Sequence, residues 1–395
     1  MKFPTLWCVL ALAALLLPAP ASAQWNCTYK GTLGQEVRLF DEPTNVGQVQ
    51  SNLGVLADVE GSCTVGERWT LGGRVYGRND FKESNRSAVR ADELWVQYAA
   101  PHFDVRIGNQ VFTWGSMEVF GITDILNSRD FLDHIVTPRK IGQPAVRARF
   151  LAGNGNLTAY YLPYFVPPAY PGQESPYSVG GTVFERNDAT ARYSGQYALR
   201  YFYGGNGFDI GVSAYSGLER DAIFEADLSR FEISNWNYRS SRVSVDATKV
   251  VGGLLLKGEA VYRKPETSRV DSAVIWAVGT EYTWTSIAGK SDLTAFFEIA
   301  GDRQKNKPSD FQFTQNNLFV GATWEPHDRL RQSINAGWVK NYAKGSGYWA
   351  FLGEYTIRPR PHLRIDFEYQ QFSHFSSMDP VSNNKNMRLM VGYEF

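Results

Sequence analysis

The residues best suited to contact a solute lie together between positions 112 and 142. Trp114 and Gly115 open this stretch, and Gly115 would permit a sharp bend. The polar side chains that follow are Glu118, Asp124, Asn127, Asp130 and Asp133. Carboxylates that line a narrow passage can select ions by charge.

The same stretch is too apolar for a loop in water. It carries Val119, Phe120, Ile122, Ile125, Leu126, Phe131 and Leu132. Burying each large apolar side chain is worth roughly 1.5–3 kcal/mol. We therefore expect the stretch to pack inside the fold, and an ordered external cap is the alternative.

Catalytic and metal-binding chemistry has little support in this sequence. Only five histidines occur, and His134 beside Asp133 is the one next to a group of acids. No motif marks a nucleophile and base within hydrogen-bond reach, a Gly-rich phosphate loop or a Cys-x-x-Cys pair. We expect no enzyme, no metal and no cofactor. The 40 acidic and 40 basic residues also argue against nucleic-acid binding.

The elements that would position these residues are β-strands. Polar and apolar residues alternate in segment after segment, as in 362–372 and 386–395, which indicates strands with one apolar face. We count about 18 such segments, an even number as in bacterial single-chain barrels, with 16 as the alternative. No later segment approaches the length of a transmembrane helix.

The connections between the expected strands fall into two classes. Counted back from the last strand, one set consists of short turns, such as 153–155 and 326–328. The other set contains every long connection: 112–142, 165–191, 219–237, 302–312 and 373–385. This asymmetry is a property of outer-membrane barrels. The sequence therefore predicts an all-β, antiparallel transmembrane barrel over 24–395, with 112–142 folded into its lumen.

The two ends of the sequence agree with this prediction. Lys2, the apolar run 6–17 and the small residues 21–23 form a secretory signal peptide over 1–23. The last strand ends on Phe395, and this resembles the C-terminal assembly signal of bacterial outer-membrane barrels. The resemblance implies recognition by the barrel assembly machinery and places Phe395 at the periplasmic rim.

A second resemblance covers about 25 residues. It joins Arg106-x-Gly108-x-Gln110, Trp114-Gly115 and Asp124-x-x-Asn127-x-x-Asp130. This pattern is similar to a motif in a porin-like outer-membrane family of Gram-negative bacteria, which resembles alginate-export-type barrels in outline. Ser128 stands where that family has Pro. The resemblance implies a pore and names no substrate.

Strand alternation assigns charged residues to the lumen wall. The predicted pore-lining residues are Arg74, Arg106, Arg147, Arg149, Arg192, Arg200, Glu298, Arg364, Asp366 and Glu368. We expect acids of the 112–142 stretch to face arginines of the wall and form a charged slot. The alternative is that wall charges pair with one another and only offset the cost of burial.

Cys27 and Cys63 are the two cysteines that follow the predicted signal peptide. Strand counting places both at the periplasmic rim, on neighbouring strands. Because the periplasm is oxidising, we expect a disulfide between them.

Together these patterns predict a passive, porin-like channel for small polar or charged solutes. It would lie in the outer membrane among lipid and lipopolysaccharide, and assembly as a homotrimer is left open. The alternative is an outer-membrane component of an export or envelope-assembly system that docks periplasmic partners through the short turns.

Overall fold

The chain is described here from a computed structural model. The described residues are 25–41, 48–134, 136–177, 182–185, 191–227, 232–303, 316–343, 348–373 and 384–395. The predicted signal peptide lies outside these residues. No helix in these ranges has the length and hydropathy of a membrane span.

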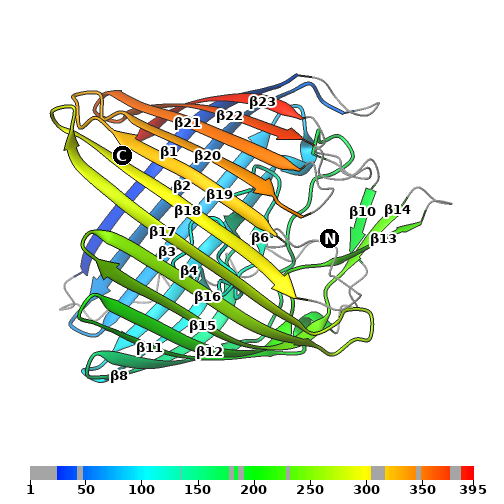
Figure 1. Ribbon diagram of the computed structural model, residues 1–395, viewed down its shortest axis with the longest axis vertical. Helices are drawn as coiled ribbons and strands as arrows, with labels where there is room; N and C mark the ends of the chain where they lie inside the picture. Colours follow the sequence, from blue (N-terminus) through cyan, green and yellow to red (C-terminus); the bar gives the residue numbers. More distant parts are fainter. Residues whose placement is uncertain are drawn as a thin grey trace.

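One closed antiparallel sheet of 18 strands forms the molecule (Figure 1). Its strands are β1 (Trp25–Phe40), β2 (Ser51–Val65), β3 (Trp69–Asp80), β4 (Ala88–Ala99), β5 (Phe103–Gln110), β8 (Gln143–Ala152), β9 (Gly155–Leu162), β11 (Gln196–Gly205), β12 (Phe208–Leu218), β15 (Arg239–Val251), β16 (Leu254–Pro265), β17 (Ala273–Ile287), β18 (Ser291–Arg303), β19 (Asn317–Glu325), β20 (Ser333–Asn341), β21 (Trp349–Arg360), β22 (Leu363–Ser373) and β23 (Lys385–Glu394). The predicted fold class is confirmed, with 18 strands rather than 16.

The barrel closes between its first and last strands. Thr32 lies opposite Glu394 and Phe40 lies opposite Asn386, so β1 pairs with β23 as well as with β2. The Phe395 backbone continues this ladder, because its N–H and carbonyl both bond to Gly31 at 2.9–3.0 Å. Cys27 lies opposite Cys63 near the same rim, and a disulfide joins the two strands there.

Alternate residues of each strand point to opposite faces of the barrel. In β23, Met387, Leu389 and Val391 are exposed on the outer face, whereas Asn386 and Met390 are buried. Exposed Val, Leu, Tyr and Trp side chains recur around the outside. A continuous apolar outer surface on a closed barrel is the surface of a membrane-spanning barrel, in which every strand edge is paired.

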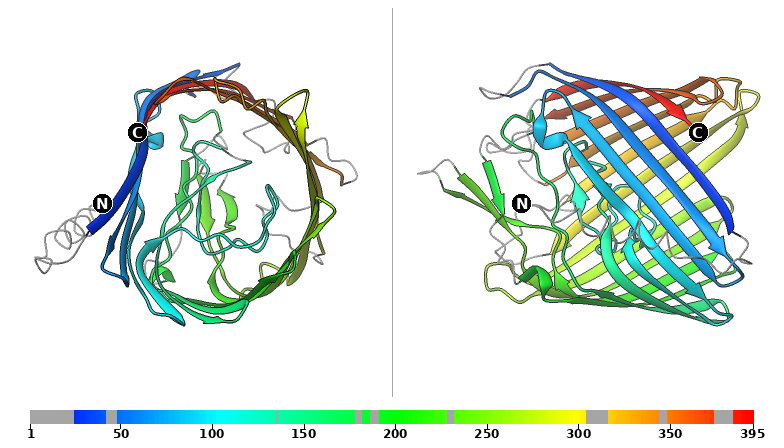
Figure 2. Two further views of the ribbon diagram at one scale, coloured as in Figure 1. Left: turned by 90° about the vertical axis from the view of Figure 1, so that its left-hand side faces the viewer. Right: turned by 180° about the vertical axis from the view of Figure 1, so that it is seen from behind.

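The long connections gather at one rim and partly enter the barrel. Figure 2 shows chain segments inside the ring of strands when the barrel is viewed along its axis. The long connections carry the short elements β6 (Arg129–Asp130), β7 (Arg139–Lys140), β10 (Thr182–Glu185), η2 (Ala191–Tyr193), β13 (Ile223–Asp227) and β14 (Glu232–Trp236). The shorter connection between β3 and β4, at the same rim, carries η1 (Ser84–Arg86). The short turns lie at the other rim, which the sequence predicts to be the periplasmic one.

Candidate pore constriction

The connection between β5 and β8, residues 112–142, is called the lumen segment below. Asn127 closes its base. The Asn127 side chain accepts a bond from the Phe112 N–H at 2.7 Å and donates to the carbonyls of Gln110 and Ile141, both at 2.9 Å. One amide therefore ties together the two ends of the segment, next to β5 and β8.

Trp114 and Gly115 turn the chain inward. The Trp114 ring is buried against Tyr160, with a centroid distance of 5.4 Å. Gly115 has a φ of +76°, and a Cβ there would lie 2.1 Å from Glu259 Oε1. The prediction of a glycine-dependent bend therefore has a steric as well as a conformational reason.

Two wall carboxylates hold the next part of the lumen segment. Glu259 of β16 accepts bonds from the Ser116 N–H at 3.1 Å and the Thr123 N–H at 2.9 Å. Glu298 of β18 accepts the N–H groups of residues 118, 119 and 120 at 2.5, 3.1 and 3.1 Å. Buried N–H groups need acceptors, and here the acceptors come from the barrel wall.

Apolar packing reinforces this attachment. Phe120 and Ile122 are buried in a cluster with Val261, Ile275 and Phe319, which belong to β16, β17 and β19. Leu126 is buried in a second cluster with Leu162 and Tyr215. The connection that follows β12 adds Arg220, whose Nη2 donates to the Leu126 carbonyl at 2.6 Å.

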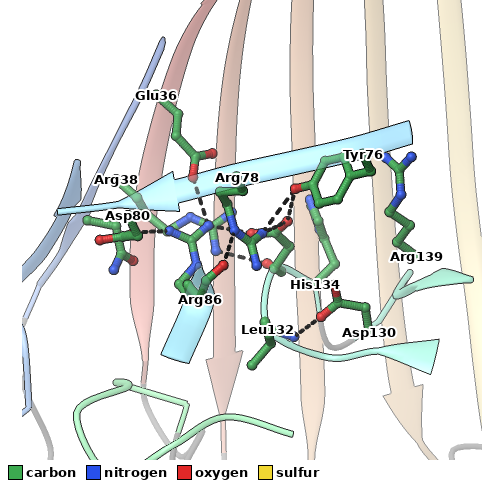
Figure 3. A network of polar contacts seen from close by, with 12 residues as sticks. Glu36, Arg38, Tyr76, Arg78, Asp80, Arg86, Asp130, Leu132, His134 and Arg139 are labelled. Carbon is green, nitrogen blue, oxygen red and sulfur yellow. Dashed lines mark hydrogen bonds and ion pairs between the residues drawn. The ribbon is translucent and has the colours of Figure 1, made fainter. Parts of the chain in front are cut away.

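The far end of the lumen segment is held by buried arginines (Figure 3). Arg78 and Arg86 both form ion pairs with Asp133, and Arg38 Nη1 donates to the Asp133 carbonyl at 2.8 Å. Arg86 also contacts Glu36 at 2.9 Å and Asp80 at 2.5 Å. Burial would raise the pKa of the Asp133 carboxyl, but Arg86 and Arg78 hold it well below its usual value.

His134 extends this attachment to the last two strands. Its Nε2 lies 3.1 Å from Glu368 Oε2, and its Nδ1 lies 3.1 Å from Gln370 Nε2. Arg388 of β23 and Arg38 of β1 lie 2.9 and 3.6 Å from the same Glu368 carboxylate. The lumen segment therefore contacts β16 and β18 through its first half and the β1, β3 and β22 region through its end.

The acids of the lumen segment have partners different from those predicted. Glu118 pairs with Lys257 at 3.1 Å, and Asp124 with Lys140 at 2.5 Å and Arg129 at 3.0 Å. Asp130 pairs with Arg90 at 2.6 Å. We expected these acids to face Arg74, Arg106, Arg147 and Arg149 across a charged slot, and this predicted pairing is wrong. Nearer cations neutralise each acid where the segment passes them.

The predicted wall arginines pair with strand residues instead. Arg74 makes a bidentate contact with Asp58 at 2.8 and 2.9 Å. Arg147 and Arg149 share Asp104, and the Arg149 contact is 2.6 Å. Arg106 stacks on the Trp95 ring, 3.6 Å from its centroid, and donates to Gln97.

A cavity of about 370 Å³ lies between this wall and the start of the lumen segment. Its lining includes Trp114, Arg147, Arg149, Tyr160, Arg200, Asp209 and Asp246. Arg200 and Asp246 form a bidentate pair at 2.6 and 2.8 Å. Cations of β8 therefore face Asp209 of β12 across the cavity.

The other predicted wall residues lie elsewhere. Arg364 contacts Asp366 at 2.8 Å near the short-turn rim. Arg192 was predicted to lie on a wall strand, and this prediction is wrong, because Arg192 is in η2, before β11 begins. Phe395 packs near Tyr29 and Tyr393, with ring centroids 6.2 and 6.4 Å away.

Several residues of this site were not predicted from the sequence. Glu259, Arg86 and Arg38 are buried polar residues whose role depends on contacts over long sequence separations. Tyr177, from the connection after β9, is also buried and bonds to Gln370 and Asn386 at 3.1 and 2.7 Å. For Glu259 and Arg38, the alternation of the strands could have predicted that the side chains face the lumen. The sequence carries no comparable signal for Arg86 and Tyr177. No group of His, Cys, Asp and Glu suited to a metal occurs among the described residues.

No family model and no curated relative matches the sequence. The fold is similar to outer-membrane porins of known structure. Pseudomonas aeruginosa OccK3 (OpdO) has a TM-score of 0.56 at 10% identity, and covers 94% of this chain and 96% of its own. Acinetobacter baumannii OccAB1 gives the same four values. Pseudomonas aeruginosa OccK11 (OpdR) has a TM-score of 0.55 at 7% identity, covering 93% of this chain and 96% of its own.

At such low identity these likenesses concern the fold alone, which is that of a porin-like outer-membrane barrel. The narrower family suggested by the Trp114-Gly115 and Asp124-x-x-Asn127-x-x-Asp130 motif stays a prediction. Within this chain, Gly115 and Asn127 of that motif have structural roles, at the bend and at the base of the lumen segment.

Proposed function

We propose that the barrel is a passive diffusion channel for small polar or charged solutes in the outer membrane, and that the lumen segment narrows it. The observation that supports this proposal is the attachment of one segment to separate parts of the wall. Glu259 and Glu298 hold its first half, and Arg78 and Arg86 hold Asp133. A segment held on separate walls limits the space left for a solute.

The charges around the cavity suggest how the channel would select solutes. Arg147 and Arg149 share one carboxylate, Asp104, on the β5 and β8 side. Asp209 lies on the β12 side of the same cavity. Opposed charges would create a field across the path, and charged groups at close quarters set porin selectivity. We propose that polar and charged solutes orient in this field as they pass.

The decisive experiment replaces residues 116–131 by a short Gly/Ser linker. Single-channel conductance in a planar bilayer should rise and ion preference should weaken. Resistance of the folded barrel to denaturation at room temperature would show that the variant folds. Unchanged conductance of a folded variant would mean that the segment caps the barrel outside the solute path.

A milder pair of variants tests the same point. Glu298→Gln weakens the carboxylate that holds the N–H groups of residues 118–120, so conductance should become noisier and larger on average. Glu354→Gln is the matched control, because Glu354 faces the lumen from β21 and contacts Arg364 rather than the lumen segment. An absence of conductance in the unmodified barrel would overturn the channel proposal itself.

A further inference from the structure

The outer face of the barrel is hollowed across five neighbouring strands. One row of directly paired, outward-facing residues holds only large side chains: Ile334, Tyr355, Phe367, Leu389 and Val37. In the next row toward the long-loop rim, Ala336 of β20 lies opposite Gly353 of β21. Because Ala336 and Gly353 have small side chains or none, they form the floor of a groove between the larger side chains around them. The resulting apolar groove has a volume of about 620 Å³.

The shape of this groove favours an extended hydrocarbon chain. The groove crosses the five strands β20, β21, β22, β23 and β1, and residues of all five line it. On β21 the floor residue Gly353 lies between Phe351 and Tyr355, which wall it on both sides. The outer surface of another barrel is convex and would bridge such a hollow without filling it. An acyl chain can follow it.

Polar and cationic side chains border the groove toward the long-loop rim. Tyr369 donates its hydroxyl to Gln371 at 2.8 Å, and Gln371 lies opposite Lys385. Lys385 is two residues beyond Met387 on the same face, about 7 Å along the strand. Lys340 lies on the outer face of β20, with its Nζ 5.8 Å from the Trp338 ring centroid.

Lys385 also contacts Asp41 at 3.2 Å, with both side chains about half exposed. Exposed ion pairs of this kind contribute little stability. A phosphate with more charge than a carboxylate can therefore share or replace the Asp41 contact. Because both lysines lie at the long-loop rim, the phosphate would come from the outer leaflet.

We propose that the groove over Ala336 and Gly353 binds an acyl chain of an outer-leaflet glycolipid with two phosphate groups, one of which contacts Lys385 of β23 and the other Lys340 of β20, three strands away. The proposal rests on the outer face alone and is independent of whether the lumen conducts solutes.

The test uses the full-length barrel in nanodiscs of phosphatidylethanolamine with added lipid A, followed by native mass spectrometry after mild detergent release. The unmodified barrel should retain lipid A in preference to phosphatidylethanolamine. Ala336→Leu fills the floor and should reduce the retained lipid A several-fold. Lys340→Gln with Lys385→Gln should reduce the preference for lipid A over phosphatidylethanolamine.

Matched controls come from the opposite part of the outer face. Ala214 is an outward-facing residue of β12 between Leu199 and Val243, so Ala214→Leu adds the same bulk outside the groove. Lys264→Gln removes an exposed cation near the long-loop end of β16. Both controls should retain lipid A as the unmodified barrel does.

Three results would overturn the proposal. Equal retention in Ala336→Leu and Ala214→Leu would exclude the groove. An unchanged lipid preference in the double lysine variant would exclude the phosphate contact. A dimer or trimer mass that Ala336→Leu abolishes would assign the groove to a second copy of the chain. If Ala336→Leu does not fold, Phe351→Ala removes one wall and should lower retention instead.

Discussion

Two groups of lumen arginines have the same chemistry and different surroundings. The anchor group consists of Arg38, Arg78, Arg86 and Arg388, at the end of the lumen segment. The wall group consists of Arg106, Arg147 and Arg149, on β5 and β8. Side chains of Arg38, Arg78 and Arg86 are 0–1% exposed and that of Arg388 is 13% exposed, whereas those of Arg147 and Arg149 are 14% and 38% exposed.

The number of carboxylates separates the two groups more sharply than exposure does. The four anchor arginines contact four acids, namely Glu36, Asp80, Asp133 and Glu368. Among the described residues, the wall group has ion-pair contact with Asp104 alone. A buried charge is tolerated only when it is paired. The anchor arginines, which have as many acidic partners as there are arginines, therefore stabilise the position of the lumen segment. The wall arginines outnumber their acidic partner, and their excess positive charge creates an electric field that acts on solutes.

The largest expected effect follows from breaking the anchor group. Asp133→Asn removes one negative charge from Arg78 and Arg86, both of which are buried. Removing one partner of a buried ion pair costs on the order of 3–5 kcal/mol, so the end of the lumen segment should detach. We expect larger, noisier single-channel conductance and a lower urea midpoint for unfolding.

Asp124→Asn is the control for this comparison. Its partners Arg129 and Lys140 belong to the lumen segment itself, and all three are partly exposed. The substitution should change conductance much less than Asp133→Asn does. Equal effects of the two variants would mean that the Asp133 contacts do not anchor the segment to the wall.

The next largest effect concerns the wall group. Arg147→Gln with Arg149→Gln removes both ion-pair partners of Asp104 and makes the surroundings of the cavity more negative, so the reversal potential under a salt gradient should shift toward cation preference. Asp209→Asn should shift it toward anions. Stability should change little in Asp209→Asn, because Asp209 is exposed. A shift of the same sign in both variants would contradict the proposed field.

The barrel could be predicted from the sequence because strand geometry is a local property. The alternation in 386–395 turns Met387, Leu389 and Val391 outward in any sheet that buries one face. The lengths of the connections likewise reflect which rim they occupy. For this reason the number of strands and the position of the long connection 112–142 could be predicted without knowing which residues contact one another.

The ion pairs could not be predicted in this way. Asp133 meets Arg86, which lies in a short connection between β3 and β4 with no periodic pattern. Glu118 meets Lys257, 139 residues away in sequence. Alternation shows which side of the wall a charge is on, but not its height along the barrel. The prediction that Arg192 lines the lumen wall was wrong for a simpler reason, because β11 begins only at Gln196.

A smaller effect is expected outside both arginine groups. Cys27→Ser with Cys63→Ser removes the link between β1 and β2 near the short-turn rim. Disulfides typically contribute about 2–4 kcal/mol, so unfolding should occur at lower urea while conductance and ion preference stay unchanged. Thiol labelling of the denatured, non-reduced barrel should find no free cysteine. Two labelled thiols would contradict the link, and altered ion preference would connect the rim to the lumen.

The smallest expected effect is that of moderately acidic pH on the anchor group. The pKa of Asp133 lies well below its ordinary value of 3.8, because Arg86 and Arg78 outweigh the effect of burial. A lowered pKa in the folded state means that the carboxylate contributes its full stabilisation above pH 3.8. This contribution is lost only as the pH falls through the lower, folded-state value.

Conductance should therefore show no step from the Asp133 contacts between neutral pH and about pH 4. His134 lies beside these contacts, with its Nε2 3.1 Å from Glu368 Oε2. His134→Gln is the control, because the contacts of Asp133 with Arg78 and Arg86 do not involve the His134 side chain. A rise in conductance between pH 7 and pH 4 that persists in His134→Gln and is absent in Asp133→Asn would show that the anchor arginines hold Asp133 less firmly than their contacts imply.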